Sequence, residues 1–150
     1  MDCVQKIAIF PGSFDPFTRG HQAIVERALP IFDKLVIAVG VNRAKVGWMS
    51  VEERLEQIRT LYAKESRVEV IAYETLTMDL ANQIGAKYIL RGVRSVMDFE
   101  YERTIADANR RIAGLETLFL ISDVEFSHIS SSLVRELASF GRDVSEFLPK

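Results

Sequence analysis

Five short apolar runs alternate with amphipathic stretches along this chain of 150 residues, and that alternation restricts the fold more than any other feature. Strands that are apolar on both faces are typical of a parallel sheet buried between helices. We therefore predict an α/β fold in one domain over residues 1–150, with a five-stranded parallel sheet and helices on both faces. The predicted strands are Lys6–Phe10, Leu35–Val41, Val68–Ala72, Tyr88–Leu90 and Thr117–Ile121.

The amphipathic stretches predict helices with recognisable ends. Ser50 can cap a helix, with Glu53 reaching back to the cap from three residues later. Further helices are expected over Gly20–Phe32, over Asp98–Ala113 and in the stretch that Gly141 ends. The apolar anchors expected in the last two helices are Phe99, Ala106, Ile112, Leu133, Leu137 and Phe140.

Charge and cysteine content exclude several classes of partner. The chain carries 19 Lys and Arg against 21 Asp and Glu, and a net charge of −2 gives no electrostatic reason to bind nucleic acid or an anionic membrane. No apolar run approaches the roughly 20 residues of a membrane span. The single cysteine, Cys3, cannot form an internal disulfide, which fits a reducing compartment. We expect a cytoplasmic protein with no nucleic-acid or membrane partner.

The segment after the first run holds the strongest motif. Ligands of such sheets bind beyond the carboxyl ends of the strands, so chemistry is expected just after each run. Thr18 can cap the next helix, which places His21 in its first turn, where free N–H groups and the helix dipole favour phosphate. A lone histidine in a first turn is more often a capping or packing residue. Thr18-x-Gly20-His21 directly after an apolar strand favours a functional role, with His21 donating to an oxyanion.

A pair of arginines follows the fourth run, in Arg91-Gly92-Val93-Arg94. Two guanidinium groups at the carboxyl end of a strand offer bidentate donors to phosphate. Ordinary surface salt bridges would explain such a pair elsewhere, but the position after a buried strand favours phosphate binding. Asp98 and Glu100 come next, and for them we favour complementing the dipole of the following helix.

A run of hydroxyls follows the fifth strand, in the segment from Phe126 to Ser132. Its serines and the free N–H groups of the next helix could cradle an anion, or could serve as an ordinary helix cap. The motifs of a P-loop, a dinucleotide site and a nucleophile elbow are all absent. His21 and His128 lie too far apart in sequence for zinc-site spacing, so no metal site is predicted.

Taken together, these segments resemble the bacterial phosphopantetheine adenylyltransferases. The resemblance rests on Pro11-Gly12-Ser13-Phe14-Asp15-Pro16, Thr18-x-Gly20-His21, Arg91-Gly92-x-Arg94, Asp98-Phe99-Glu100-Tyr101-Glu102 and Ile129-Ser130-Ser131-Ser132, within a match from about Lys6 to Pro149. It implies a Rossmann-like fold and AMP transfer from ATP to 4′-phosphopantetheine, giving dephospho-coenzyme A and pyrophosphate. It also implies Mg²⁺ bound with ATP, a homohexamer and a cytoplasmic location.

The resemblance assigns roles to individual residues. His21, Lys45 and Arg94 are the implied catalytic residues, with His21 stabilising the transition state on the ATP phosphates. The implied acceptor contacts are Ser13, Lys45, Thr77 and Arg91, although Ser13 replaces the usual threonine and Thr77 an apolar residue. The implied ATP-binding residues are Ser13, Phe14, His21, Gly92, Val93, Arg94, Glu102, Phe126, Ser127, His128, Ile129, Ser130, Ser131 and Ser132.

This inventory predicts a reaction without a general base. The attacking phosphate, with a second pKa of roughly 6, is largely ionised at neutral pH. Catalysis would rest on positioning two anions and neutralising charge as pyrophosphate leaves. Another nucleotidyltransferase, with a cytidine nucleotide or nicotinamide mononucleotide as substrate, is the runner-up. A regulatory nucleotide-binding module and an RNA-binding fragment are less favoured.

Overall fold

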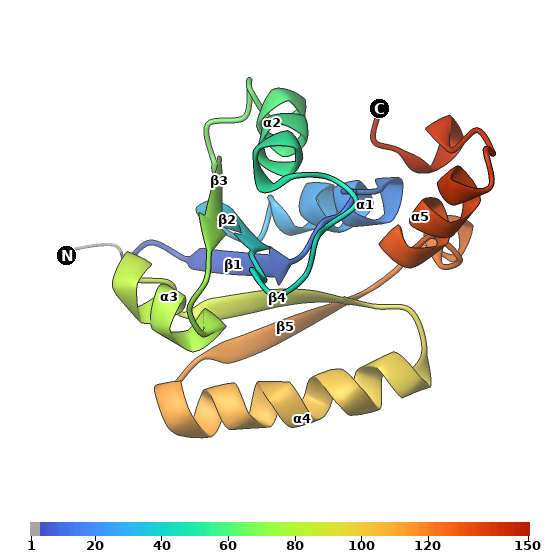
Figure 1. Ribbon diagram of the computed structural model, residues 1–150. Helices are drawn as coiled ribbons and strands as arrows, with labels where there is room; N and C mark the ends of the chain where they lie inside the picture. Colours follow the sequence, from blue (N-terminus) through green and yellow to red (C-terminus); the bar gives the residue numbers. More distant parts are fainter. Residues whose placement is uncertain (1–3) are drawn as a thin grey trace.

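A computed structural model describes residues 4–150 of the chain as a single parallel sheet flanked by helices (Figure 1). The prediction for Cys3 lies outside these residues. The strands are β1 (Ile7–Gly12), β2 (Lys34–Gly40), β3 (Val68–Tyr73), β4 (Tyr88–Val93) and β5 (Glu116–Ile121). The main helices are α1 (Arg19–Ala28), α2 (Val51–Leu61), α3 (Thr77–Ile84), α4 (Val96–Ala113) and α5 (Ser131–Ser139). All five predicted strands are confirmed.

The strand order is β3-β2-β1-β4-β5, which places β1 at the centre of the sheet. From β1 the chain moves outward to β2 and β3, then returns to the other side of β1 to form β4 and β5. The order therefore reverses between β1 and β4. In open α/β sheets a crevice forms at this reversal, beyond the carboxyl ends of the two strands.

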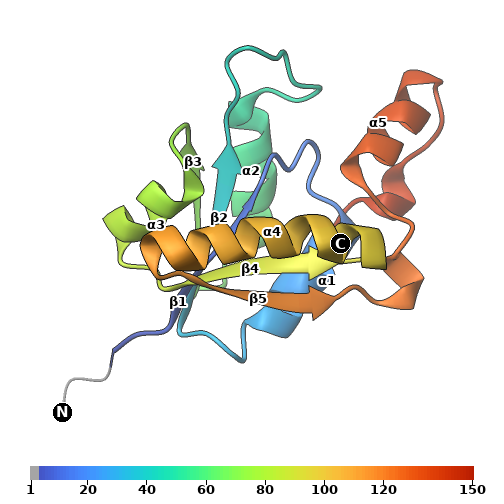
Figure 2. The ribbon, with the colours of Figure 1, turned by 90° about the horizontal axis from the view of Figure 1, so that it is seen from below.

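Helices cover both faces of the sheet, as predicted (Figures 1 and 2). Successive side chains of a strand point to opposite faces, so Phe10 packs into the core under α1 and α2. Its neighbour Ile9 packs with Leu80 of α3 and with Leu115 on the other face. The strands are apolar at nearly every position because both faces of the sheet are covered by helices.

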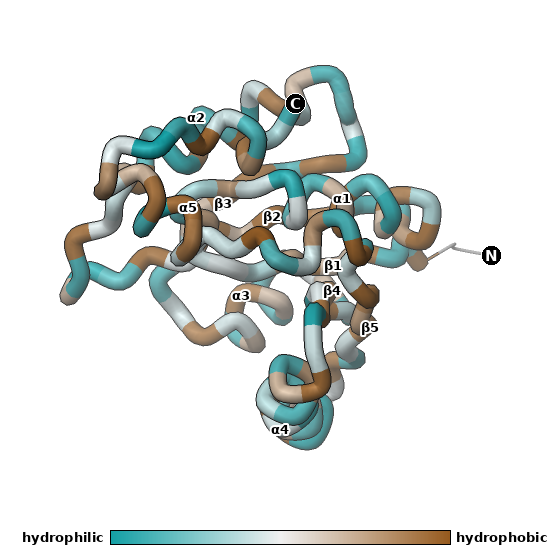
Figure 3. Tube along the Cα trace, turned by 90° about the vertical axis from the view of Figure 1, so that its right-hand side faces the viewer, coloured by the Kyte–Doolittle hydropathy of each residue, from teal (hydrophilic) through white to brown (hydrophobic). Residues whose placement is uncertain are grey.

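The helix α4 packs against the sheet beside β4 and β5, and its hydrophilic colours stand out in Figure 3. Ile112 is 71% exposed, so the prediction that it anchors α4 is wrong. The side of α4 toward the sheet instead carries Glu102, Ala106 and Asn109, spaced by three or four residues. The helix also begins at Val96, two residues earlier than predicted.

In the last helix, α5, the predicted apolar anchor Phe140 is also exposed. Phe140 is 81% exposed because the helix has already ended at Ser139, and the buried residue of α5 is Val134. Gly141 follows with a positive φ of 76°, as expected of a residue that ends a helix. The predicted capping box, in which the Ser50 and Glu53 side chains each bond the other's backbone N–H, is confirmed at the start of α2.

Candidate active site

Two cavities of about 360 and 340 Å³ meet beyond the carboxyl ends of β1 and β4. The first, the α4-side cavity, lies against α4 and is lined by Gly40, Tyr73, Thr77, Ile89, Tyr101, Ile105, Ala106, Asn109 and Thr117. The second, the α5-side cavity, is lined by His21, Gly92, Arg94, Phe126, Ile129, Ser130, Ser131, Ser132 and Arg135, with several neighbours. Both cavities share Pro11, Gly12, Ser13, Arg91 and Glu102. Ligands bound in the two cavities would therefore meet at these five residues.

The loop between β1 and α1 forms the boundary between the cavities. It turns sharply at Phe14, whose φ of 48° is uncommon for a residue with a side chain. The Phe14 ring folds back over Gly12, where an added Cβ would lie 2.9 Å from the ring. Glycine is therefore required at position 12. Ser13, between these two residues, lines both cavities.

His21 is held by the start of its own helix. Its ring Nδ1 accepts a hydrogen bond from the backbone N–H of Thr18 at 3.0 Å, while the Thr18 hydroxyl accepts from the His21 backbone N–H. A backbone N–H can only donate, so the proton of the neutral imidazole lies on Nε2. The box that caps α1 thus leaves Nε2–H as a donor in the α5-side cavity.

The surroundings of His21 keep its imidazole neutral. Burial, together with the positive charges of Arg91 and Arg94, lowers the pKa of His21 from 6.5 to about 3. The ring packs against Phe14 and Phe17, with centroids 5.0 and 5.2 Å away. His21 can therefore donate a hydrogen bond at neutral pH without carrying a charge.

Arg91 is fixed between the two cavities. Its guanidinium makes a bidentate pair with Glu102, with Nε to Oε2 at 2.9 Å and Nη2 to Oε1 at 2.6 Å, and Nη1 donates to the Pro11 carbonyl at 2.6 Å. These bonds leave some of its N–H groups free for a ligand. Arg94 is held more loosely, by bonds of 3.3 Å to Asp98 and to the Ile129 carbonyl.

The serine run begins α5 and lines the α5-side cavity. Ser130 caps the helix by accepting from the Leu133 N–H at 3.1 Å, and Ser131 donates to the Pro16 carbonyl at 2.7 Å. The structure therefore confirms the capping role. It also brings the N-terminus of α5 to a cavity that contains Arg94 and His21, a combination that favours an anion.

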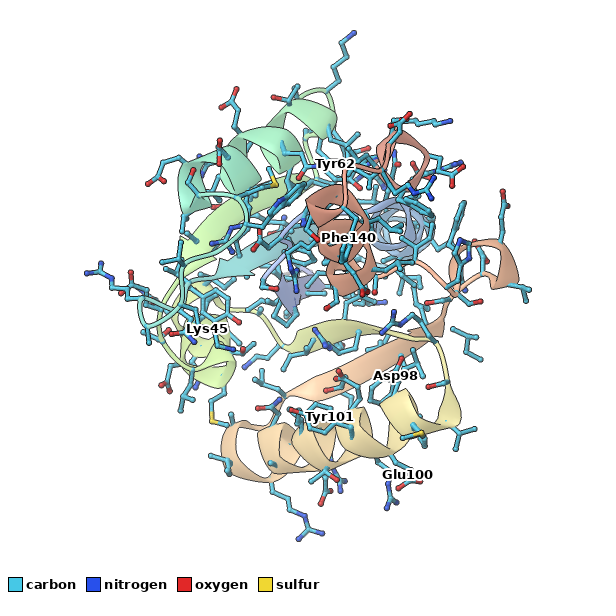
Figure 4. The ribbon with its side chains drawn as sticks, turned by 45° about the vertical axis from the view of Figure 1, so that its right-hand side comes forward. Lys45, Tyr62, Asp98, Glu100, Tyr101 and Phe140 are labelled. Carbon is cyan, nitrogen blue, oxygen red and sulfur yellow. The ribbon has the colours of Figure 1, made fainter. Side chains whose placement is uncertain are left out.

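Four predicted site residues lie outside both cavities. Val93 is buried because it alternates with Gly92 along β4, and Ser127 donates its hydroxyl to the Val124 carbonyl. The His128 ring packs against Phe147, with centroids 6.1 Å apart. Lys45 lies on the exposed loop between β2 and α2 (Figure 4). Their roles in binding stay predictions.

Arg135 and Asn109 are among the lining residues that were not predicted, although helical spacing indicates them. Arg135 lies four residues after Ser131, on the same face of α5. Asn109 lies seven residues after Glu102 on α4 and is 8% exposed. Figure 4 shows the same helix phase, with Asp98 and Tyr101 on the side of α4 that faces the strands and Glu100 on the opposite side.

Two classes of feature are absent from residues 4–150. No three His, Cys, Asp or Glu side chains gather closely enough there to hold a metal ion. The helices of this part of the chain are also too short or too polar to cross a membrane.

Comparison with known proteins points to one family. Residues 9–137 match the family described as cytidylyltransferase-like. A phosphopantetheine adenylyltransferase of Porphyromonas gingivalis is 56% identical over 146 residues, which cover 97% of this chain and 95% of that protein. The enzymes of the same name from Phocaeicola vulgatus and Bacteroides thetaiotaomicron are 52% and 49% identical over 143 residues, with 95% of each chain covered.

Solved structures share the fold at much lower identity. A putative nicotinate-nucleotide adenylyltransferase from Vibrio parahaemolyticus superposes with a TM-score of 0.72 at 20% identity, covering 98% of this chain and 95% of that one. A bifunctional NMN adenylyltransferase/ADP ribose pyrophosphatase from Francisella tularensis gives 0.76 at 14% identity. This chain is covered to 97% in that match and spans 45% of the bifunctional protein. These likenesses confirm a Rossmann-like fold.

Proposed function

The chain belongs to the phosphopantetheine adenylyltransferase family of nucleotidyltransferases, and we propose that it transfers AMP from ATP to 4′-phosphopantetheine. The products are dephospho-coenzyme A and pyrophosphate, in the penultimate step of coenzyme A synthesis. The observation that carries the proposal is the meeting of two cavities at Ser13, Arg91 and Glu102. A reaction between two bound anions needs such an arrangement.

The lining of each cavity suggests its ligand. The α5-side cavity contains Arg94, the N-terminus of α5 and the neutral donor His21, which suit the phosphates of ATP. The α4-side cavity combines apolar side chains such as Ile105 with the amide of Asn109. That mixture suits the pantetheine arm, which carries amides along an aliphatic chain. Thr77 would lie beside this arm.

The proposed chemistry is an in-line displacement. A phosphate oxygen of the acceptor attacks the α-phosphorus of ATP, and the bond from that phosphorus to the bridging oxygen of pyrophosphate breaks. The acceptor phosphate is already ionised, so no general base is needed. His21 and Arg94 stabilise the negative charge that grows as pyrophosphate leaves. Arg91 and Lys45 hold the acceptor phosphate, Lys45 reaching it from its loop.

Three further expectations belong to this proposal. Mg²⁺ would arrive with ATP, whose phosphates supply oxygen ligands, since residues 4–150 offer no cluster of metal-binding side chains. The ion would neutralise phosphate charge, while the residues of this chain orient the two substrates. We also expect a homohexamer in the cytoplasm.

A direct assay tests the proposed reaction. The protein is incubated with ATP, Mg²⁺ and 4′-phosphopantetheine, and dephospho-coenzyme A is measured by mass spectrometry. Parallel reactions replace ATP with CTP, or the acceptor with nicotinamide mononucleotide. Product from the first mixture alone supports the proposal. Faster pyrophosphate release with CTP or with nicotinamide mononucleotide would favour the runner-up activities, and no turnover in any mixture would favour a regulatory module.

A further inference from the structure

The loop between β2 and α2, residues 41–50, is largely exposed, yet the part next to α2 is tied to a buried carboxylate. Asp15 is 7% exposed, and each of its carboxylate oxygens accepts one backbone N–H of this loop. Oδ2 accepts from Trp48 at 2.8 Å and Oδ1 accepts from Met49 at 2.7 Å. Burying a charge is costly unless it is well hydrogen-bonded, so these two bonds are strong and specific.

Asp15 is itself held rigidly. Its backbone carbonyl accepts from Nη1 of Arg135 at 2.7 Å, and the neighbouring Ser13 carbonyl accepts from Nη1 of Arg54 at 2.7 Å. These bonds come from α5 and α2, on different sides of the β1–α1 loop. The carboxylate therefore holds the 41–50 loop against a fixed support rather than moving with it.

The contact between Asp15 and the loop leaves no spare room. A Cβ added at Gly47 would lie 2.8 Å from the Met49 carbonyl oxygen and 3.1 Å from Oδ2 of Asp15. Both distances are too short for ordinary contacts. Glycine at position 47 thus allows the chain to turn directly over the carboxylate, and any larger residue would push the two apart.

The fixed point is close in sequence to Lys45. Trp48 lies three residues after Lys45, and three extended residues span at most about 10 Å, so the anchor limits where the Lys45 backbone can go. The other end of the loop is fixed by the Val41 N–H, which donates to the Tyr73 carbonyl at 2.9 Å. Lys45 therefore lies in a short loop segment that is held by hydrogen bonds at both ends (Figure 4).

We propose that Asp15 is a positioning residue, which fixes the 41–50 loop so that Lys45 meets the acceptor phosphate. This inference rests on the proposed function, which places that phosphate near Lys45 and Arg91. Asp15 touches neither ligand in this scheme and acts through the backbone of the loop. Because the same β1–α1 loop carries Ser13, Asp15 also links the acceptor loop to the boundary between the two cavities.

Two variants disturb the contact from opposite sides. Asp15→Asn replaces one accepting oxygen by an NH₂ group that cannot accept, and Gly47→Ala separates the chain from the carboxylate. Each is expected to raise the KM for 4′-phosphopantetheine about tenfold, the typical effect of losing a hydrogen bond to a charged group. The Kd for ATP, measured by calorimetry without acceptor, is expected to change less than about twofold.

A control changes another carboxylate that accepts a backbone N–H, an exposed one far from the site. Asp33 also accepts a backbone N–H, from Lys6 at 2.7 Å, but it lies at the opposite end of the sheet, just before β2. Asp33→Asn is expected to leave the acceptor KM unchanged. Equal effects from Asp33→Asn, or a lower melting temperature with a normal KM in both loop variants, would overturn the inference.

A double-mutant cycle separates this inference from the proposed function. If Asp15 acts through Lys45, Asp15→Asn adds no further rise in acceptor KM to a Lys45→Ala enzyme. Gly47→Ala provides the same cycle if Asp15→Asn does not fold. Additive rises would overturn the positioning role while leaving the acceptor site in place. A normal acceptor KM in Lys45→Ala alone would refute the role proposed for Lys45, and the positioning role of Asp15 with it.

Discussion

Substitution of His21 tests the central element of the proposed mechanism. The ring is expected to do two things: Nδ1 accepts the Thr18 N–H at 3.0 Å, and Nε2–H is left as a donor on a residue that lines the cavity proposed for ATP. His21→Ala removes both. Loss of the cap costs about 1 kcal/mol of unfolding free energy, and the missing ring adds a packing loss among Phe14 and Phe17. Loss of the donor should lower kcat by about 10²–10³.

Two nearly isosteric replacements separate the two roles. The side-chain oxygens of glutamine and glutamate can both accept the Thr18 N–H, as they do in ordinary capping boxes. Only glutamine also brings an NH₂ group that can donate to a phosphate. We expect His21→Gln and His21→Glu to keep similar stability, and kcat to be at least about tenfold lower in His21→Glu, which also repels the nucleotide.

The measurements are urea unfolding, calorimetric ATP binding and single-turnover rates on the same preparations. His21→Ala is expected to bind ATP with little loss, because its donor acts mainly on charge that develops during the reaction. Raising the pH should not restore its rate, since no general base is missing. Equal single-turnover rates for the glutamine and glutamate variants, or a near-normal rate for folded His21→Ala, would refute the donor role.

Three further predictions follow from the geometry of the site. The pKa of His21 is about 3 in the folded protein and 6.5 in the unfolded chain, so the unfolded state binds more protons between these two pH values. The part of the unfolding free energy that depends on His21 is therefore complete above pH 6.5 and is lost as the pH falls toward 3. Urea unfolding at pH 5 should therefore show a loss of about 2 kcal/mol relative to pH 7 that is absent from His21→Gln. Arg91→Ala should raise the KM for 4′-phosphopantetheine at least about tenfold with little change in the calorimetric Kd for ATP, because the acceptor phosphate loses one of its two cations. An equal loss of ATP affinity would contradict the assignment of Arg91 to the acceptor phosphate. Gly12→Ala should lower the melting temperature and weaken both ligands, because the new Cβ would lie 2.9 Å from the Phe14 ring at the boundary of both cavities; unchanged binding of either ligand would contradict this.

Features that depend on neighbours in sequence were predictable. The box of Ser50 and Glu53 and the placement of His21 in a first turn need only bonds between residues three apart, and both are present. Of the predicted anchors of α4, Phe99 packs against Phe119 and Ala106 faces the sheet, but Ile112 is exposed, because an apolar residue can also lie on a solvent-facing side of a helix. The lining residues Glu102 and Asn109 are polar and seven residues apart on the side of α4 that faces the cavity, which the apolar pattern alone did not indicate.

By itself, the sequence determined the α/β class, the strands and the motifs that lie beyond them, because a buried strand or a capped helix is encoded within a few neighbouring residues. Only the tertiary structure decided how those motifs act together. The neutrality of His21 depends on burial and on arginines about 70 residues away, and the anchor of the Lys45 loop joins Asp15 to residues more than 30 positions later. Such interactions depend on distance in space, which neither composition nor local spacing records.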